Sequence, residues 1–255
     1  MMFCASLTPM CRWFVMVFAV AVLSASVSQA EDVDVELVLA VDDSGSVDAA
    51  EYALQIAGYA EAFRDPSIQA AITSGPLGKI AAAMVIWGDA ALPKHTTRWY
   101  LLDSAAAAES FANDLTLLGK RTRAAGGFGG GGTGIGDAVR HAIEMMSQNR
   151  HRGVRRVVDV TGDGPETPPW FRKAMMMPEA KVMAGQHRVT INGLAILSDF
   201  ADLDVWYRDN VIYGPGSFVL HADSFETFAQ AIRRKLWLEL AQQIAQSALP
   251  GVSVP

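Results

Sequence analysis

Oxygen-bearing side chains with the spacing of metal ligands follow an apolar run near the N-terminus. Asp42, Ser44 and Ser46 occupy alternate positions, so in an extended loop their oxygens would project to one side. A carboxylate and two hydroxyls form a hard ligand set, which suits Mg²⁺, Mn²⁺ or Ca²⁺ better than soft metals. Gly45 allows the backbone to turn tightly enough to bring them together. The segment predicts the first half of a divalent-cation site.

Two later segments offer further oxygen ligands. Thr133 lies in a glycine-rich loop over 126–136 that opens directly into a predicted amphipathic helix. Asp163 follows a predicted strand at 155–161, as the first triplet also follows a strand. In open α/β sheets, ligands bind outside the carboxyl ends of the strands. We therefore expect these side chains to meet at one edge of a sheet.

Apolar periodicity and turn residues place the elements that must position these side chains. Asp48 with Glu51 has the pattern of a capping box, and Asp65-Pro66 marks the end of that helix. The predicted strands are 37–41, 80–87, 96–101, 155–161, 189–197 and 218–221, and the predicted helices are 48–65, 103–118, 137–146, 202–210 and 223–245, with one more helix after a loop within 166–187. This alternation predicts an α/β fold, doubly wound, with a mostly parallel central sheet and helices on both faces.

The two ends of the chain fall outside the predicted domain, which we place at 31–248. Residues 1–30 have the pattern of a secretory signal peptide, since Arg12 is their only charge and an apolar run at 13–23 precedes small residues. That run is too short to span a bilayer, so we expect no membrane span after cleavage. Residues 249–255 are expected to form a flexible tail. The predicted location is periplasmic or secreted.

Composition limits the possible functions further. Both cysteines, Cys4 and Cys11, lie in the predicted leader, so the mature chain would depend on its core without a disulfide. The formal net charge is −6, and it becomes more negative when the leader is removed. This balance argues against a nucleic-acid partner, although basic residues cluster at 150–156 and 233–235.

The three ligand-bearing segments together resemble the metal-ion-dependent adhesion site of von Willebrand factor type A domains. The triplet D-x-S-x-S is intact, Gly132-Thr133-Gly134 resembles the threonine loop, and Thr161-Gly162-Asp163-Gly164 resembles T-D-G with one glycine inserted. The sequence is most similar to a bacterial, exported branch of such proteins without an assigned function. That resemblance covers most of 32–240 and rests on VDDSGSVDAAEY, DPSIQAAI, GPLGKIA, GGGTGIGDA, VVDVTGDGP, VTINGLAIL, GPGSFV and FAQAIRRKL.

The resemblance implies a role for each ligand. Ser44 and Ser46 would bind the metal directly, Asp42 and Asp163 would act mostly through water, and Thr133 would bind directly in one state and through water in another. Such a site leaves one coordination position for an acidic residue of a partner protein. Two departures from the family pattern affect this expectation. Asp43 adds a carboxylate that could favour Ca²⁺ or repel an acidic ligand, and the inserted glycine shifts Asp163 by one position.

Other functions fit the sequence less well. The glycine loop matches G-x-G-x-x-G at Gly129, Gly131 and Gly134, but no strand precedes it, and no Lys-Ser/Thr follows as in a P-loop. A phosphatase-type nucleophile at Asp42 would need a second aspartate where Ser44 stands. No G-x-S-x-G elbow is present, and the five histidines are scattered.

The sequence therefore predicts a protein-binding module of the cell envelope that depends on Mg²⁺, or on Mn²⁺ or Ca²⁺. Two alternatives remain open. The same loops could serve a metal-assisted hydrolase or phosphotransferase, or the metal could only stabilise a structural envelope protein. The lack of a general base near the triplet favours binding, because a metal alone does not supply one.

Overall fold

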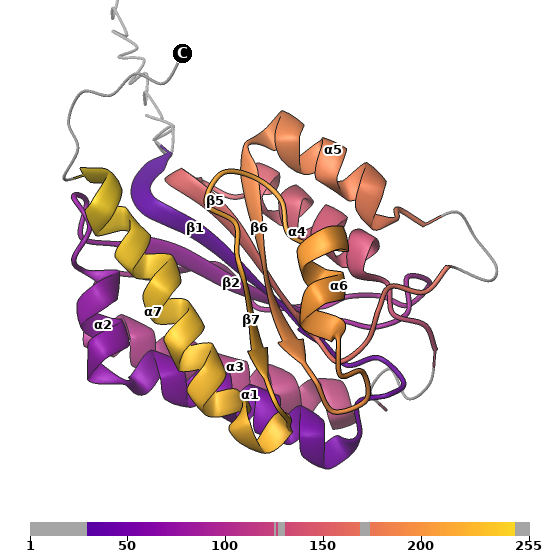
Figure 1. Ribbon diagram of the computed structural model, residues 1–255. Helices are drawn as coiled ribbons and strands as arrows, with labels where there is room; N and C mark the ends of the chain where they lie inside the picture. Colours follow the sequence, from indigo (N-terminus) through magenta and orange to yellow (C-terminus); the bar gives the residue numbers. More distant parts are fainter. Residues whose placement is uncertain (1–29, 125, 127–130, 169–173, 248–255) are drawn as a thin grey trace, which may run out of the picture.

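The computed structural model describes residues 30–124, 126, 131–168 and 174–247. The predicted leader up to residue 29 and the predicted tail lie outside the described residues. Figure 1 shows a central sheet with helices on both of its faces. This arrangement is the α/β, mostly parallel architecture expected from the sequence.

The sheet has seven strands in the order β3-β2-β1-β5-β6-β7, with β4 also paired to β2. The pairs β1·β2, β1·β5, β5·β6 and β6·β7 are parallel, and the short β3 and β4 run antiparallel to β2. The strands are β1 (Glu31–Asp42), β2 (Ile80–Trp87), β3 (His95–Thr96), β4 (Tyr100–Leu102), β5 (His151–Gly162), β6 (Val189–Ile196) and β7 (Val219–Ala222).

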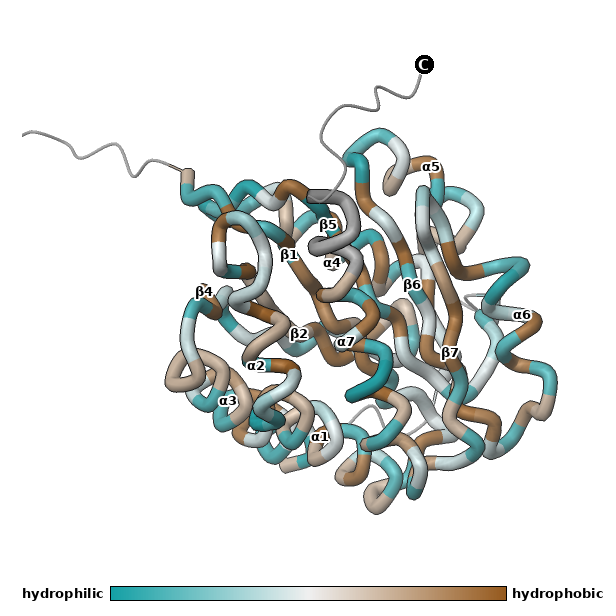
Figure 2. Tube along the Cα trace, turned by 60° about the vertical axis from the view of Figure 1, so that its left-hand side comes forward, coloured by the Kyte–Doolittle hydropathy of each residue, from teal (hydrophilic) through white to brown (hydrophobic). Residues whose placement is uncertain are grey.

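Helices cover the two faces of the sheet as separate groups. They are α1 (Ala49–Arg64), α2 (Pro66–Ile72), α3 (Ala105–Ala124), α4 (Ile135–Gln148), α5 (Met177–His187), α6 (Leu203–Asn210) and α7 (Phe228–Ser247), with a 3₁₀ turn, η1 (Phe225–Thr227), before the last. One apolar core joins the sheet to α1, α2, α3 and α7, and the other joins it to α4, α5 and α6. Figure 2 shows apolar residues following the central strands and polar residues at the outer turns.

Most predicted elements are confirmed, and the differences have local causes. The helix α2 was not predicted, because Asp65-Pro66 also starts it: Asp65 accepts a hydrogen bond from Ser67 N at 2.8 Å and Pro66 takes the first helical position. The segment expected as one strand at 96–101 is two short strands. The predicted cap of the last helix at Asp223 and Glu226 is wrong, since Ser224 and Thr227 form the capping box over η1.

Charged side chains are buried between α7 and the sheet. Lys235, on α7, forms an ion pair with Asp159 of β5 and a second, at 3.3 Å, with Glu239 one turn along. Glu239 also accepts a hydrogen bond from Asn192 of β6 at 2.5 Å. All four side chains are at least 98 % buried. Opposite charges and hydrogen bonds meet in this network, which compensates the buried charges in part.

The described residues contain no helix that is both long and apolar enough to cross a membrane.

Candidate metal centre

The topology brings the predicted ligands to one edge of the sheet. After β1 the chain adds β2 on one side and later β5 on the other, so the strand order reverses next to β1. Adjacent parallel strands whose connections leave in opposite directions open a crevice at their carboxyl ends. Asp42 ends β1, and Asp163 comes directly after β5. The crevice between β1 and β5 is therefore lined by both predicted aspartates.

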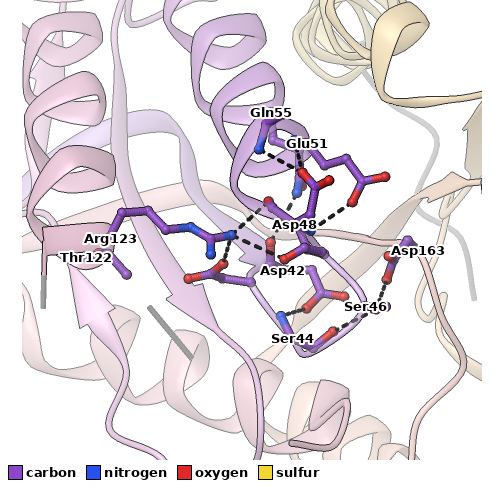
Figure 3. A network of polar contacts seen from close by, with 12 residues as sticks. Asp42, Ser44, Ser46, Asp48, Glu51, Gln55, Thr122, Arg123 and Asp163 are labelled. Carbon is purple, nitrogen blue, oxygen red and sulfur yellow. Dashed lines mark hydrogen bonds and ion pairs between the residues drawn. The ribbon is translucent and has the colours of Figure 1, made fainter. Parts of the chain in front are cut away.

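Short hydrogen bonds connect the triplet to Asp163 (Figure 3). Asp42 Oδ1 accepts a hydrogen bond from Ser44 N at 2.7 Å, which folds the loop back over the end of β1. The Oγ atoms of Ser44 and Ser46 lie 3.4 Å apart, and Ser46 Oγ donates to Asp163 Oδ1 at 2.8 Å. Four of the five predicted ligands thus form one chain of contacts from two loops.

The glycine inserted before Asp163 does not displace that residue from the site. Gly162 extends β5 by one residue and pairs with Ala195 of β6. A Cβ at position 162 would lie 2.7 Å from both Asp42 Oδ2 and the Tyr207 hydroxyl, too close for any side chain. Glycine therefore stands here because the Asp42 carboxylate fills the space, and the chain still brings Asp163 to Ser46.

The fifth predicted ligand, Thr133, is held by backbone contacts. Thr133 N donates to Thr167 Oγ1 at 2.7 Å, and its carbonyl accepts from Thr167 N at 3.0 Å. On the other side, Gly132 N donates to Asp89 Oδ2 at 2.9 Å. The Thr133 hydroxyl points toward the site, since it lies 3.9 Å from the Cβ position of Gly164. The Thr133 loop is thereby fixed against the loop after β5, which carries Asp163.

Glu166 is a positioning residue that the sequence analysis did not find. Its two carboxylate oxygens accept hydrogen bonds from Gly136 N at 2.7 Å and Met177 N at 2.9 Å, in the first turns of α4 and α5. Neither helix has a side-chain cap of its own. Glu166 therefore satisfies one backbone N–H group at the N-terminus of each of the two helices. The nearest sequence signal would have been the lack of a capping residue before either helix.

Asp43, the extra carboxylate, is turned away from the predicted ligands. Its side chain is almost fully buried and pairs with Arg123 Nη2 at 2.5 Å. The same guanidinium donates to the carbonyls of Val47 and Asp48, and it lies 4.5 Å from the centre of the Tyr52 ring. Arg123, from the end of α3, thus pairs with the charge of Asp43 and contacts both the beginning and the end of the loop between β1 and α1. This pairing weakens the expectation that Asp43 repels an acidic ligand.

The electrostatics of the site favour a cation. Burial, followed by the charge of Asp163, raises the pKa of Asp42 well above its usual value. Burial and then the charge of Asp199 raise the pKa of Asp163. Asp42 Oδ2 is buried without a hydrogen-bond partner. A buried carboxylate oxygen without a donor is costly, and a divalent cation with its water would compensate it. The residues therefore fit the predicted ion.

The hydroxyl content of the site distinguishes it from other metal centres. Among the described residues, no group of three or more His, Cys, Asp or Glu side chains could hold a metal. Only two of the predicted ligands are carboxylates, and three are hydroxyls. A site of this kind keeps the metal electrophilic toward an added carboxylate.

The fold, with its hydroxyl-rich crevice between β1 and β5, defines a von Willebrand factor type A-like domain. The chain belongs to the family described as protein of unknown function (DUF1194), whose model matches residues 32–244. No curated protein matches the sequence. The family assignment agrees with the resemblance drawn from the motifs.

Solved structures support this fold at low sequence identity. The vWF domain of the type V pili tip protein Mfa5 from Porphyromonas gingivalis is 13% identical, with a TM-score of 0.50 over 87% of this chain and 98% of that one. The pilus adhesin SpaC from Lactobacillus rhamnosus GG is 13% identical, with a TM-score of 0.56 over 86% of this chain and 31% of that one. Proximal thread matrix protein 1 from the mussel byssus, with a zinc-occupied MIDAS motif, is 18% identical, with a TM-score of 0.53 over 84% of this chain and 49% of that one. The chain spans about half the length of the mussel protein.

A substitution at Gly162 tests whether the Asp42 carboxylate requires the space beside it. We expect Gly162→Ala to lower the free energy of unfolding by about 1–3 kcal/mol, because the added methyl group overlaps Asp42 and Tyr207. Gly164→Ala is the matched control, since its Cβ would meet only ordinary contacts at 3.7 and 3.9 Å. Urea unfolding of the metal-free protein measures both. Equal stability of the two variants would contradict the described packing.

Proposed function

We propose that the chain is a divalent-cation-dependent protein-binding module of the bacterial cell envelope. The observation that carries the proposal is the Asp42 carboxylate, buried with one oxygen unpartnered beside the Ser46–Asp163 contact. Asp42, Ser44, Ser46, Thr133 and Asp163 would hold Mg²⁺, with Mn²⁺ or Ca²⁺ as alternatives. Bound there, the metal would supply a positive centre for an oxygen ligand.

The proposed partner is a protein that offers an acidic residue to the metal. Two carboxylates against a doubly charged cation, with three neutral hydroxyls, leave the metal able to attract a further carboxylate. Asp43 does not oppose this approach, because its charge is paired with Arg123. The zinc-occupied site of the mussel protein and the adhesin relative support a binding module by similarity of fold.

Binding is favoured over the hydrolase or phosphotransferase alternative by the position two residues after Asp42. An aspartyl nucleophile there would need a second acid that transfers the proton. That position is Ser44, whose hydroxyl faces Ser46. We therefore assign Asp42 to metal binding.

Metal binding should depend on the two serines. The mature protein should bind Mg²⁺ or Mn²⁺ in titration calorimetry, and Ser44→Ala combined with Ser46→Ala should weaken binding by more than about tenfold, because both hydroxyl ligands are lost. Ser110→Ala is the control, since that hydroxyl only donates to Ala106 O within α3. Titration of the double variant with wild-type affinity would remove the site from these residues.

Partner binding should require both metal and a carboxylate. A random dodecapeptide library displayed on phage is selected against the immobilised mature protein in Mn²⁺ and eluted with EDTA. We expect an acidic residue in nearly every eluted peptide and few binders to the Ser44→Ala, Ser46→Ala variant. Peptides that stay bound in EDTA, or that lack an acidic residue, would count against the proposed function.

Export is proposed from the leader pattern, with Arg12 as its only charge. Mass spectrometry of the protein from its own cells should find Glu31 at the N-terminus and the domain 31–248 in the envelope or medium. A cytoplasmic species that keeps Met1 or Met2 would contradict both the cleavage and the periplasmic or secreted location.

A further inference from the structure

A hollow of about 380 Å³ lies beside the proposed metal centre, between the loop after β5 and the start of α6. Aromatic and aliphatic side chains supply much of its lining, and two carboxylates also border it. The lining residues are Pro165, Asp199, Phe200, Ala201, Asp202, Leu203 and Trp206. Phe200 is 48 % exposed, so part of its ring is open to solvent at the hollow. The hollow therefore offers apolar surface to something outside the chain.

The hollow adjoins the predicted ligands directly. A Cβ atom added at Gly164 would lie 3.7 Å from the Phe200 ring and 3.9 Å from the Thr133 hydroxyl, so these two side chains both lie beside Gly164. Pro165, which lines the hollow, follows two residues after Asp163. A peptide whose carboxylate reached the metal would therefore place a neighbouring side chain over Phe200.

Two carboxylates at the rim of the hollow indicate which kind of side chain it would bind. In the part of the chain that the structure describes, the side chains of Asp199 and Asp202 form no ion pair and accept no hydrogen bond. Both are exposed, so their charges face solvent at the rim. Asp204, by comparison, is paired with Arg208 at 3.5 Å. An apolar floor with two unpaired carboxylates suits a long apolar stem that ends in a cation.

We infer that this hollow binds a lysine or arginine side chain from the same partner segment that offers its carboxylate to the metal. The inference rests on the proposed function and adds the second residue of the partner's binding motif. The aliphatic stem would lie on Phe200 and Leu203, and the cationic head would reach Asp199 and Asp202. The partner segment thus carries an acidic and a basic residue close together.

Selection with an altered rim tests the inference. The same phage library is selected in Mn²⁺ against the wild type and against Asp199→Asn combined with Asp202→Asn. Asparagine keeps the shape of each side chain and remains a good residue at the start of α6. We expect lysine or arginine beside the acidic residue in wild-type binders. In binders to the variant, the acidic residue should persist while the basic residue falls to the frequency of the library.

One enriched peptide, and its copy with methionine in place of the basic residue, then measures the contact by fluorescence anisotropy. The double variant should bind the basic peptide about fivefold more weakly, the loss expected when two exposed carboxylates no longer pair with the cation, and should bind the methionine peptide unchanged. Asp209→Asn is the control, because it removes the same charge from α6 outside the hollow.

The outcomes separate this inference from the proposed function. Metal-dependent acidic peptides without an enriched basic residue, or equal losses for both peptides, would overturn the inference and leave the metal-dependent function intact. Enrichment of an apolar residue in place of the basic one would assign the hollow to a different side chain. Absence of any metal-dependent binder would overturn both.

Discussion

The Asp42 carboxylate is enclosed at the end of the central strand, and the surrounding loops are arranged around that one constraint. One of its oxygens accepts a hydrogen bond from the backbone of Ser44, and the other has no donor among the residues that the structure describes. A carboxylate in such surroundings is expensive unless opposite charge or hydrogen bonds reach it. The neighbouring strand β5 has a glycine, Gly162, where a side chain would overlap the carboxylate. Gln55 Nε2 donates a hydrogen bond to the backbone carbonyl of Asp42 at 3.1 Å. Packing therefore sets the position of Asp42 at the candidate site.

Preorganisation of the site comes from residues that would not touch the metal. Thr167 and Asp89 accept hydrogen bonds from the backbone of the Thr133 loop. Glu166 accepts hydrogen bonds from the N-termini of two helices, and Arg123 pairs with Asp43. Each of these contacts joins segments far apart in the chain. A site fixed in this manner loses little conformational entropy when a ligand binds, which favours affinity.

The sequence predicted the fold well where local pattern and tertiary structure agree. Buried parallel strands such as β2 appear as continuous apolar runs, and the Asp48–Glu51 capping box is visible from spacing alone. It failed where one residue has two roles: Asp65 stops α1 and also starts α2. The prediction was also wrong at the start of the last helix, because Ser224 and Thr227 form the capping box there and the predicted pair Asp223 and Glu226 does not.

Asp42, Ser44 and Ser46 could be proposed as ligands from their local spacing, whereas the residues that hold the candidate site could not be found in this way. Glu166 and Thr167 have ordinary surroundings in the sequence, and their roles depend on contacts with Gly136 and Thr133, which lie 30 and 34 positions away. The orientation of Asp43 could not be predicted either, because its cation arrives from the end of α3. Long-range pairing of this kind leaves no periodic signal in a single sequence.

The buried pair of Lys235 and Asp159 has a consequence for the order of folding. Asp159 lies on a central strand, and its cation follows 76 residues later on the last helix. Asp159 lies on the face of the sheet that this helix covers, so docking of the helix buries the carboxylate together with its cation. Synthesis delivers the N-terminal strands first, yet the finished core must wait for the C-terminal segment. One face of the sheet is therefore completed only by the last helix, and a chain that ended before Lys235 would leave Asp159 without its cation.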